Sequence, residues 1–261
     1  MRAALLVPVA LLAACRGGRA GDTFVWHDTV PAGRQVTIHN LNGPVRVRAA
    51  TGPEVEVRAV KHYKGFRPQR VRFITTSGRQ GVVVCAMWGR GGECSEDEYR
   101  ARTSLWPRIL SLRSEVQVEF TVAVPPGVRV NAQTTNGSVR VDGVAAPVKA
   151  STVNGSIRVA TSAGPVTASA VNGSIVARVD SFAAAGPMTL TTVNGSVTAE
   201  LPPELDATLD MQTVNGRVDA DFPVTVTGSV SSRRLHGTVG SGGRAIKLET
   251  VNGRVAVRRG A

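Results

Sequence analysis

Two aspartates, Asp219 and Asp221, are the nearest thing in this sequence to a catalytic pair. They stand two residues apart, so on a strand they share one face, and paired carboxylates hydrolyse glycosidic bonds as acid and base. Arg217 beside them favours a simpler interpretation, two solvated charges on an outward face. The four histidines are scattered, and neither a nucleophile elbow nor a phosphate-binding loop occurs. We therefore predict no catalytic residues, no metal and no cofactor.

Cys15 has the sequence context of an export and lipidation signal. A basic start is followed by the apolar residues 3–14, which are too few for a membrane-spanning helix and typical of a secretory signal. Leu12-Ala13-Ala14-Cys15 resembles the lipobox of bacterial lipoproteins, whose cysteine becomes the acylated first residue. We expect a signal peptide over 1–14 and a lipid anchor with a tether over 15–23. Ordinary signal cleavage without lipidation is the alternative.

The other two cysteines, Cys85 and Cys94, form an even pair once Cys15 is lipidated. In an oxidising envelope they can close a loop of about ten residues as a disulfide, although two free thiols are the alternative. These features together predict a location in the bacterial cell envelope, exported and lipid-anchored, at the periplasmic face or the outer membrane.

Charge favours anionic partners. Thirty-one Lys and Arg residues against 19 Asp and Glu residues give a formal net charge of +12, and such an excess attracts polyanions. Export makes nucleic acid an unexpected partner, so an anionic envelope polymer or a protein partner is predicted. Basic and aromatic residues give a candidate ligand surface, with a solvated strand and loop as the alternative. Its members are Lys61, Lys64, Arg67, Trp88 and Trp106.

An Asn-Gly dipeptide flanked by Val, Ile or Thr recurs through the second half of the chain. The spacing is 16 to 22 residues when Leu235-His236-Gly237-Thr238-Val239 is counted as a degenerate copy. Such a period predicts a solenoid or an array of hairpins. We interpret the dipeptides as structural corners with positive φ at both positions. They are Asn136-Gly137, Asn154-Gly155, Asn172-Gly173, Asn194-Gly195, Asn215-Gly216 and Asn252-Gly253.

Small and β-branched residues alternate with polar ones on both sides of each corner, which predicts an all-β protein. The invariance of the corners favours a solenoid, because stacked asparagines can satisfy one another's amides. An antiparallel β meander or sandwich is the alternative. We expect an irregular N-terminal part over 24–130 and a β-repeat region over 131–261 continuous with it. The alternation stops over 85–113, an excursion in which Ser95 and Glu98 form a capping-box pattern that predicts one short helix.

The anchored start, the Val124-Pro125-Pro126-Gly127-Val128 segment and the serial Asn-Gly units together resemble the bacterial family of putative adhesins known as domain of unknown function 4097. The resemblance covers roughly residues 30–258. It implies a right-handed β-helix-like solenoid in the cell envelope, a role in binding or adhesion, and no enzyme activity or cofactor. It supplies no site residues, and the excursion departs from its pattern.

We therefore expect a non-catalytic envelope lipoprotein that acts as an adhesive or structural binding module. A lipoprotein that senses envelope stress is the alternative, and a β-helix enzyme that degrades polysaccharide is the third hypothesis.

Overall fold

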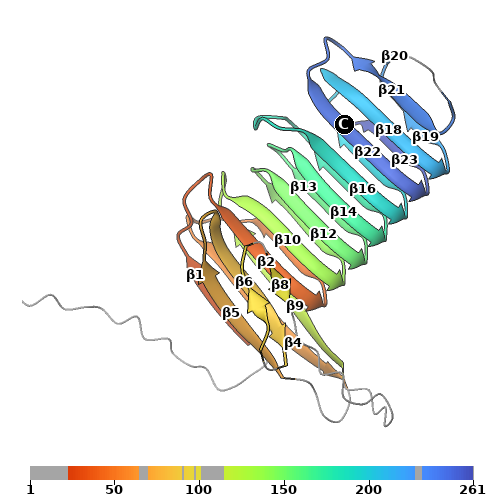
Figure 1. Ribbon diagram of the computed structural model, residues 1–261. Coiled ribbons are helices and arrows are strands. Elements are labelled where there is room, and N and C mark those ends of the chain that lie inside the picture. Colours follow the sequence, from red (N-terminus) through yellow and green to blue (C-terminus); the bar gives the residue numbers. More distant parts are fainter. Residues whose placement is uncertain are drawn as a thin grey trace, which may run out of the picture.

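The computed structural model describes residues 23–64, 70–89, 91–96, 98–100, 115–226 and 231–260. These residues form strands and turns, with no helix among them. Most strands belong to two long sheets, in each of which the strands follow one another along one axis (Figure 1). It follows that the described part of the chain holds no helix of the length and apolarity needed to cross a bilayer. The predicted all-β solenoid is confirmed.

Sheet A has ten strands. In spatial order they are β1 (Thr23–Asp28), β4 (Val55–Lys64), β9 (Glu115–Val124), β3 (Val45–Ala49), β11 (Val139–Val144), β13 (Ile157–Thr161), β15 (Ile175–Val179), β17 (Val197–Leu201), β23 (Val255–Arg259) and β19 (Val218–Ala220).

Sheet B has eleven strands. In spatial order they are β20 (Thr225–Val226), β21 (Arg234–Val239), β18 (Ala207–Asn215), β22 (Arg244–Asn252), β16 (Met188–Asn194), β14 (Val166–Asn172), β12 (Val148–Asn154), β10 (Arg129–Asn136), β2 (Gln35–Asn42), β6 (Gly81–Trp88) and β5 (Val71–Ser77). A separate hairpin pairs β7 (Glu93–Cys94) with β8 (Tyr99–Arg100).

Each regular coil runs along a strand of sheet B, turns at an Asn-Gly corner and returns along a strand of sheet A. Neighbouring coils pair in parallel and in phase, so that Asn154 aligns with Asn136 and Ile157 with Val139. Equivalent residues of successive coils therefore lie one strand spacing apart, about 4.8 Å.

The core lies between the two sheets and is filled by alternate residues of both. In the coil β12–β13, Val148, Ala150 and Thr152 are buried from one side and Ile157 and Val159 from the other. Valine, alanine and threonine suit this narrow interior because they are short, and β-branched residues favour strands. The only aromatic side chain in the described part that is less than 2 % exposed is Phe120, at the wider N-terminal end.

The asparagines of the corners form a continuous ladder. After the first asparagine, Asn136, each Nδ2 donates to Oδ1 of the asparagine in the coil before it in space, over 2.7–2.9 Å. In spatial order the ladder is Asn136, Asn154, Asn172, Asn194, Asn252 and Asn215. Behind it, buried threonines such as Thr152 and Thr192 donate from Oγ1 to a corner glycine carbonyl of the adjacent coil, over 2.9 and 2.8 Å.

Glycine is required at the corner mainly because the coils stack closely. A Cβ on Gly173 would lie 1.9 Å from the carbonyl oxygen of Gly155, and one on Gly155 would lie 2.1 Å from that of Gly137. All described residues with positive φ are glycines, so the prediction of positive φ at the corner asparagines is wrong. The asparagines keep an ordinary strand backbone, and their role is the side-chain ladder.

The N-terminal end of the solenoid is closed by antiparallel strands. β6 and β9 pair in parallel with β2 and β3 and form one more coil, onto which β5 and β4 add in antiparallel fashion, followed by β1. Phe24 stacks on Phe73 with ring centroids 4.7 Å apart, and Phe73 meets the edge of Phe120 at 6.1 Å. These rings cover the end of the core.

The C-terminal end is covered by β21, which pairs antiparallel with β18 and in turn carries β20. His236 and Gly237 lie inside β21, opposite Asp210 and Leu209. The interpretation of His236-Gly237 as a degenerate corner is therefore wrong, because an antiparallel cap strand, not a coil, occupies this segment.

The coil β6–β9 has no Asn-Gly corner. Cys85 to Trp88 belong to β6, so the excursion begins after Trp88 and not at Cys85. The β7–β8 hairpin follows, and its turn has a hydrogen bond from the Glu98 amide to Ser95 Oγ over 2.9 Å. Ser95 and Glu98 thus close a hairpin, and the predicted short helix is replaced by this turn because strand pairing continues on both sides.

Candidate functional site

The predicted lipid anchor and part of the predicted ligand surface lie outside the described residues. This holds for Cys15, Arg67 and Trp106, and the side chain of Lys64 is likewise not described.

The described members of the candidate ligand surface do not form an outward cluster. Trp88 is 3 % exposed and packs in the main core, so its assignment to a ligand surface is corrected. Lys61 is half-buried, with Nζ 5.0 Å from the centre of the Phe73 ring. Both residues close the N-terminal end of the solenoid, where the inward positions of β4 and β6 meet the aromatic rings.

The predicted disulfide between Cys85 and Cys94 is present, with a Cα–Cα distance of 6.2 Å. It joins β6 to the β7–β8 hairpin and lies in a small second core with Val83 and Met87. The bond therefore fixes the excursion against sheet B.

Tyr99 of the hairpin lies flat on His39 of β2, with ring centroids 5.1 Å apart. Its hydroxyl donates to the Ala86 carbonyl over 2.6 Å. Burial lowers the pKa of His39 to about 4, against a smaller opposing effect of the Ser95 backbone, and burial raises the pKa of Tyr99. Both rings are therefore neutral near pH 7 and act as packing groups.

Asp219 and Asp221 form ion pairs with arginines of the neighbouring coil. Arg254 Nε lies 3.3 Å from Asp219 Oδ2, and Arg258 donates from a guanidinium nitrogen to Asp221 Oδ1 over 2.8 Å. All four side chains are partly exposed. This arrangement fits solvated surface charges, and the described residues include no cluster of His, Cys, Asp or Glu suited to a metal ion.

The most marked chemical feature is a row of arginines on the outer face of sheet A. Arg46, Arg140 and Arg158 align on the adjacent strands β3, β11 and β13, and all three are exposed. On the other side of Arg46 the line continues through Thr121 of β9 to Arg58 of β4, two strands away from β3. We call Arg46, Arg140, Arg158 and Arg58 the arginine row.

Acidic neighbours balance only part of this charge. Arg46 contacts Glu119, and Arg140 donates from Nε to Asp142 over 2.6 Å. Within the described part of the chain, Arg58 and Arg158 form no ion pair, and both extend into solvent. The row therefore keeps guanidinium donors directed at solvent, a geometry suited to carboxylates and phosphates.

The sequence does contain a signal for this row, but only when repeats are aligned on the corner asparagine. The residue four positions later is Arg46 after Asn42, Arg140 after Asn136 and Arg158 after Asn154. In the following coils, in spatial order, this position holds Val176, Thr198, Ala256 and Asp219. At this position of the coil, arginine is thus confined to the N-terminal half of the face, whereas Arg178 and Arg258 on the C-terminal half form ion pairs with Asp180 and Asp221.

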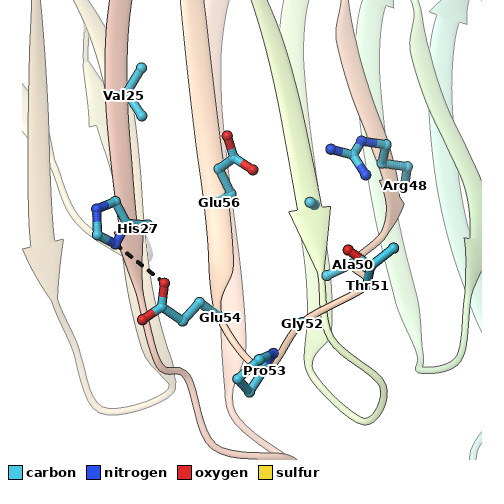
Figure 2. A pocket seen from close by; sticks show the side chains of 10 residues that line it. Val25, His27, Arg48, Ala50, Thr51, Gly52, Pro53, Glu54 and Glu56 are labelled. Carbon is cyan, nitrogen blue, oxygen red and sulfur yellow. Dashed lines mark ion pairs between the residues drawn. The ribbon is translucent and has the colours of Figure 1, made fainter.

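A shallow pocket of about 610 Å³ adjoins the row on the same face (Figure 2). Its floor is the small residue Ala123 of β9, between Arg48 of β3 and Glu56 of β4. His27 Nδ1 lies 3.3 Å from Glu54 Oε2 at the rim. Arg48 brings a further cation to the face, and Glu56 lies on the same face of β4 as Arg58, two residues away.

Residues 111–258 match the family model described as Toastrack DUF4097, and the chain therefore belongs to this family. Its structure resembles that of a "putative cell adhesion protein" from Clostridium sporogenes, with a TM-score of 0.50 and 10 % identity over 91 % of this chain and all of that one. A "putative adhesin" from Bacteroides fragilis gives a TM-score of 0.30 and 6 % identity, covering 91 % of this chain and 96 % of that one. None of the curated proteins matches the sequence. The Clostridium likeness shows the fold.

Proposed function

We propose that this protein is a non-catalytic binding module of the bacterial cell envelope, and that it holds an anionic envelope polymer along the arginine row of sheet A. The observation that carries the proposal is the alignment of Arg46, Arg140 and Arg158 on three adjacent strands. Strand spacing sets the arginines about 4.8 Å apart, so one extended polyanion lying along the solenoid axis meets several guanidinium groups at once. The net charge of +12 assists the approach of such a polymer.

The binding chemistry is that of guanidinium with phosphate or carboxylate. Each arginine presents a planar set of donors that can pair with two oxygens of one group. A rigid parallel stack keeps the row in place without ordering a loop, so little backbone entropy is lost by the protein on binding. Description of a protein of this fold as a putative cell adhesion protein agrees with such a role.

The test compares binding of three probes at low and at moderate salt: lipopolysaccharide, teichoic acid and polygalacturonate. The variant Arg46→Gln/Arg140→Gln/Arg158→Gln should lose about tenfold or more in affinity at low salt, and the difference should shrink as salt screens the charges. The control variant is Arg217→Gln/Arg233→Gln/Arg234→Gln. It removes the same number of positive charges, but from the C-terminal end, and should bind nearly as well as the parent. If both variants lose the same affinity, binding depends on the overall charge of the protein and not on the arginine row.

The three probes also separate phosphate from carboxylate recognition. Binding of lipopolysaccharide and teichoic acid but not of polygalacturonate would identify phosphate as the recognised group. Turnover of any probe, measured in the same samples, would contradict the non-catalytic role.

Attachment to the membrane through Cys15 is the second part of the proposal. The Leu12–Cys15 motif supports it, because acyl chains at Cys15 would anchor the module firmly. We expect Cys15→Ser to move the protein from the membrane fraction to the soluble envelope fraction. Recovery of the variant in the membrane fraction would contradict lipid anchoring at this residue.

A further inference from the structure

The coils do not stack in the order in which they occur in the chain. The last coil, β22–β23, lies between β16–β17 and β18–β19, both of which precede it in sequence. Figure 1 shows this dark-blue coil between β16 and β18. Along the chain, β18–β19 and the cap strand β21 come first. The last 17 described residues, 244–260, then return and occupy the place between two earlier coils. We call this place the slot.

The last coil is bound in the slot by the same contacts that join all other coils. On one side Asn252 donates to Asn194 over 2.7 Å, and on the other Asn215 donates to Asn252 over 2.8 Å. The buried hydroxyl of Thr250 donates to the Gly195 carbonyl over 2.8 Å. Nothing in these contacts depends on the coil belonging to the same chain.

The last coil contributes several fully buried side chains to the core. Side chains of the last coil that are no more than 1 % exposed are Ile246, Leu248, Val255 and Val257. An empty slot would leave four unpaired strand edges, on β16, β17, β18 and β19, so the slot needs a coil.

The loop that leads into the slot is short and rich in glycine. It joins Val239 of β21 to Arg244 of β22, which flank Ala207 of β18 on opposite sides. Gly240, Gly242 and Gly243 all have positive φ, at 59°, 81° and 112°. The loop therefore crosses one strand, a span of about 10 Å, in four residues.

We propose that the last coil is exchangeable, and that two copies of this protein form a dimer in which each donates residues 244–260 to the slot of the other. A donated coil makes the same hydrogen bonds and buries the same side chains as the coil in its own chain. The two states then differ mainly in the conformation of the glycine loop and in association entropy, the usual basis of exchange between identical chains. A second copy is the partner because it carries the side chains that fit Met188, Leu190 and Leu209 in register.

The experiment uses two full-length chains, one with Thr191→Cys and the other with Glu249→Cys, and Cys15→Ser in both. These positions pair in register between β16 and β22 and lie on the outer face, at a spacing that a disulfide can bridge. The two chains are unfolded, mixed at high concentration, refolded and oxidised. A covalent link between them forms readily if the last coil of one lies beside β16 of the other, whereas collision of separate chains gives only a background of linked dimer.

The matched control is a mixture of Ser151→Cys and Ser169→Cys, which pair in register between β12 and β14. These coils follow each other in sequence, and the proposal does not exchange them. We expect at least about tenfold more linked dimer from the Thr191/Glu249 pair than from the control. Equal yields would overturn the proposal.

A second variant, deletion of Gly242 and Gly243, leaves a loop that can barely span the required distance. Strained hinge loops favour exchange, so light scattering should give twice the mass of one chain. A folded monomer would overturn the proposal. If this variant does not fold, the cysteine mixtures with the natural loop decide alone.

Discussion

The central coils and the N-terminal coil β6–β9 solve the same problem in different ways. Each must pass from sheet B to sheet A and hold its neighbour in register. The central coils do this with an Asn-Gly corner whose side chains and backbone contact the identical corner of the next coil. The coil β6–β9 replaces the corner by an excursion fixed by the Cys85–Cys94 disulfide and by the stacking of Tyr99 on His39.

The difference shows two sources of specificity. A repeated corner is stabilised by copies of itself, so its stability depends on stacking and resists changes of pH. The excursion depends on single contacts that occur once in the molecule, one of them covalent and one involving a titratable ring. Perturbations that damage one region should therefore leave the other largely intact.

The largest effect is expected from Gly173→Val in the middle of the ladder. The added side chain would collide with the Gly155 carbonyl, 1.9 Å from its Cβ, and force two coils apart. We expect a loss of about 3 kcal/mol or more in the free energy of unfolding, measured by denaturant titration. Gly52→Val is the control, because no heavy atom lies within 4 Å of the added Cβ. Equal midpoints for both variants would contradict the stacking account.

Removal of the disulfide by Cys85→Ser/Cys94→Ser should cost about 2 to 3 kcal/mol by loop entropy for a ten-residue loop. The loss should be concentrated in the excursion. Hydrogen exchange is therefore expected to accelerate in β7 and β8 and to stay slow in β12 and β14. Uniform acceleration along the chain would show that the excursion supports the whole solenoid.

Acid should weaken the N-terminal region through His39. Its pKa is about 4 in the folded protein against 6.5 for an exposed histidine, so the unfolded chain binds more protons between these values. The contribution is complete above pH 6.5 and is lost as pH falls toward 4, with about 2 kcal/mol lost at pH 5. His39→Gln should flatten the stability profile between pH 7 and pH 5. A parent profile that is already flat would exclude this role of His39.

Asn172→Ala should have a smaller effect. It removes two hydrogen bonds of the ladder, to Asn154 and from Asn194, both at the exposed edge. We expect a loss of about 1 kcal/mol in thermal or chemical unfolding. Asn215→Ala, at the end of the ladder, removes one such bond and should cost about half as much. A larger loss from Asn215→Ala would show that the bonds do not contribute equally.

A gain of similar size to these losses is expected at Ala170. Ala170 stands where the neighbouring coils have Thr152 and Thr192, whose hydroxyls donate to corner carbonyls. Ala170→Thr should supply the equivalent bond to the Gly155 carbonyl and add about 0.5–1.5 kcal/mol. Ala170→Val has a similar shape without the hydroxyl, so an equal gain from valine would assign the effect to packing.

The regular part of this fold is predictable because its signal is repeated. Every Asn-Gly corner occurs with the same alternation on both sides, and each copy reinforces the interpretation of the others. The order of the coils is not predictable in this way. The coils with an Asn-Gly corner all share one register, so the sequence carries no local sign that Asn252 lies between Asn194 and Asn215.

The candidate sites were harder to predict because they depend on three-dimensional placement. Trp88 belongs to an aromatic and basic neighbourhood in sequence, but its inward position on β6 places it in the core. His236-Gly237 has the spacing of a corner, yet it pairs inside an antiparallel cap strand. The arginine row is visible in the aligned repeats, but its importance depends on the pairing of β3 with β11, two strands about ninety residues apart in the chain.

Binding by the arginine row is the central claim, and arginine footprinting tests it most directly. The protein is treated with phenylglyoxal with and without a bound anionic polymer, and modification is measured at each arginine by mass spectrometry. We expect the polymer to slow modification of Arg46, Arg140 and Arg158 severalfold and to leave Arg217, Arg233 and Arg234 unchanged. Equal protection at all six, or protection confined to the C-terminal three, would contradict a binding site on this face.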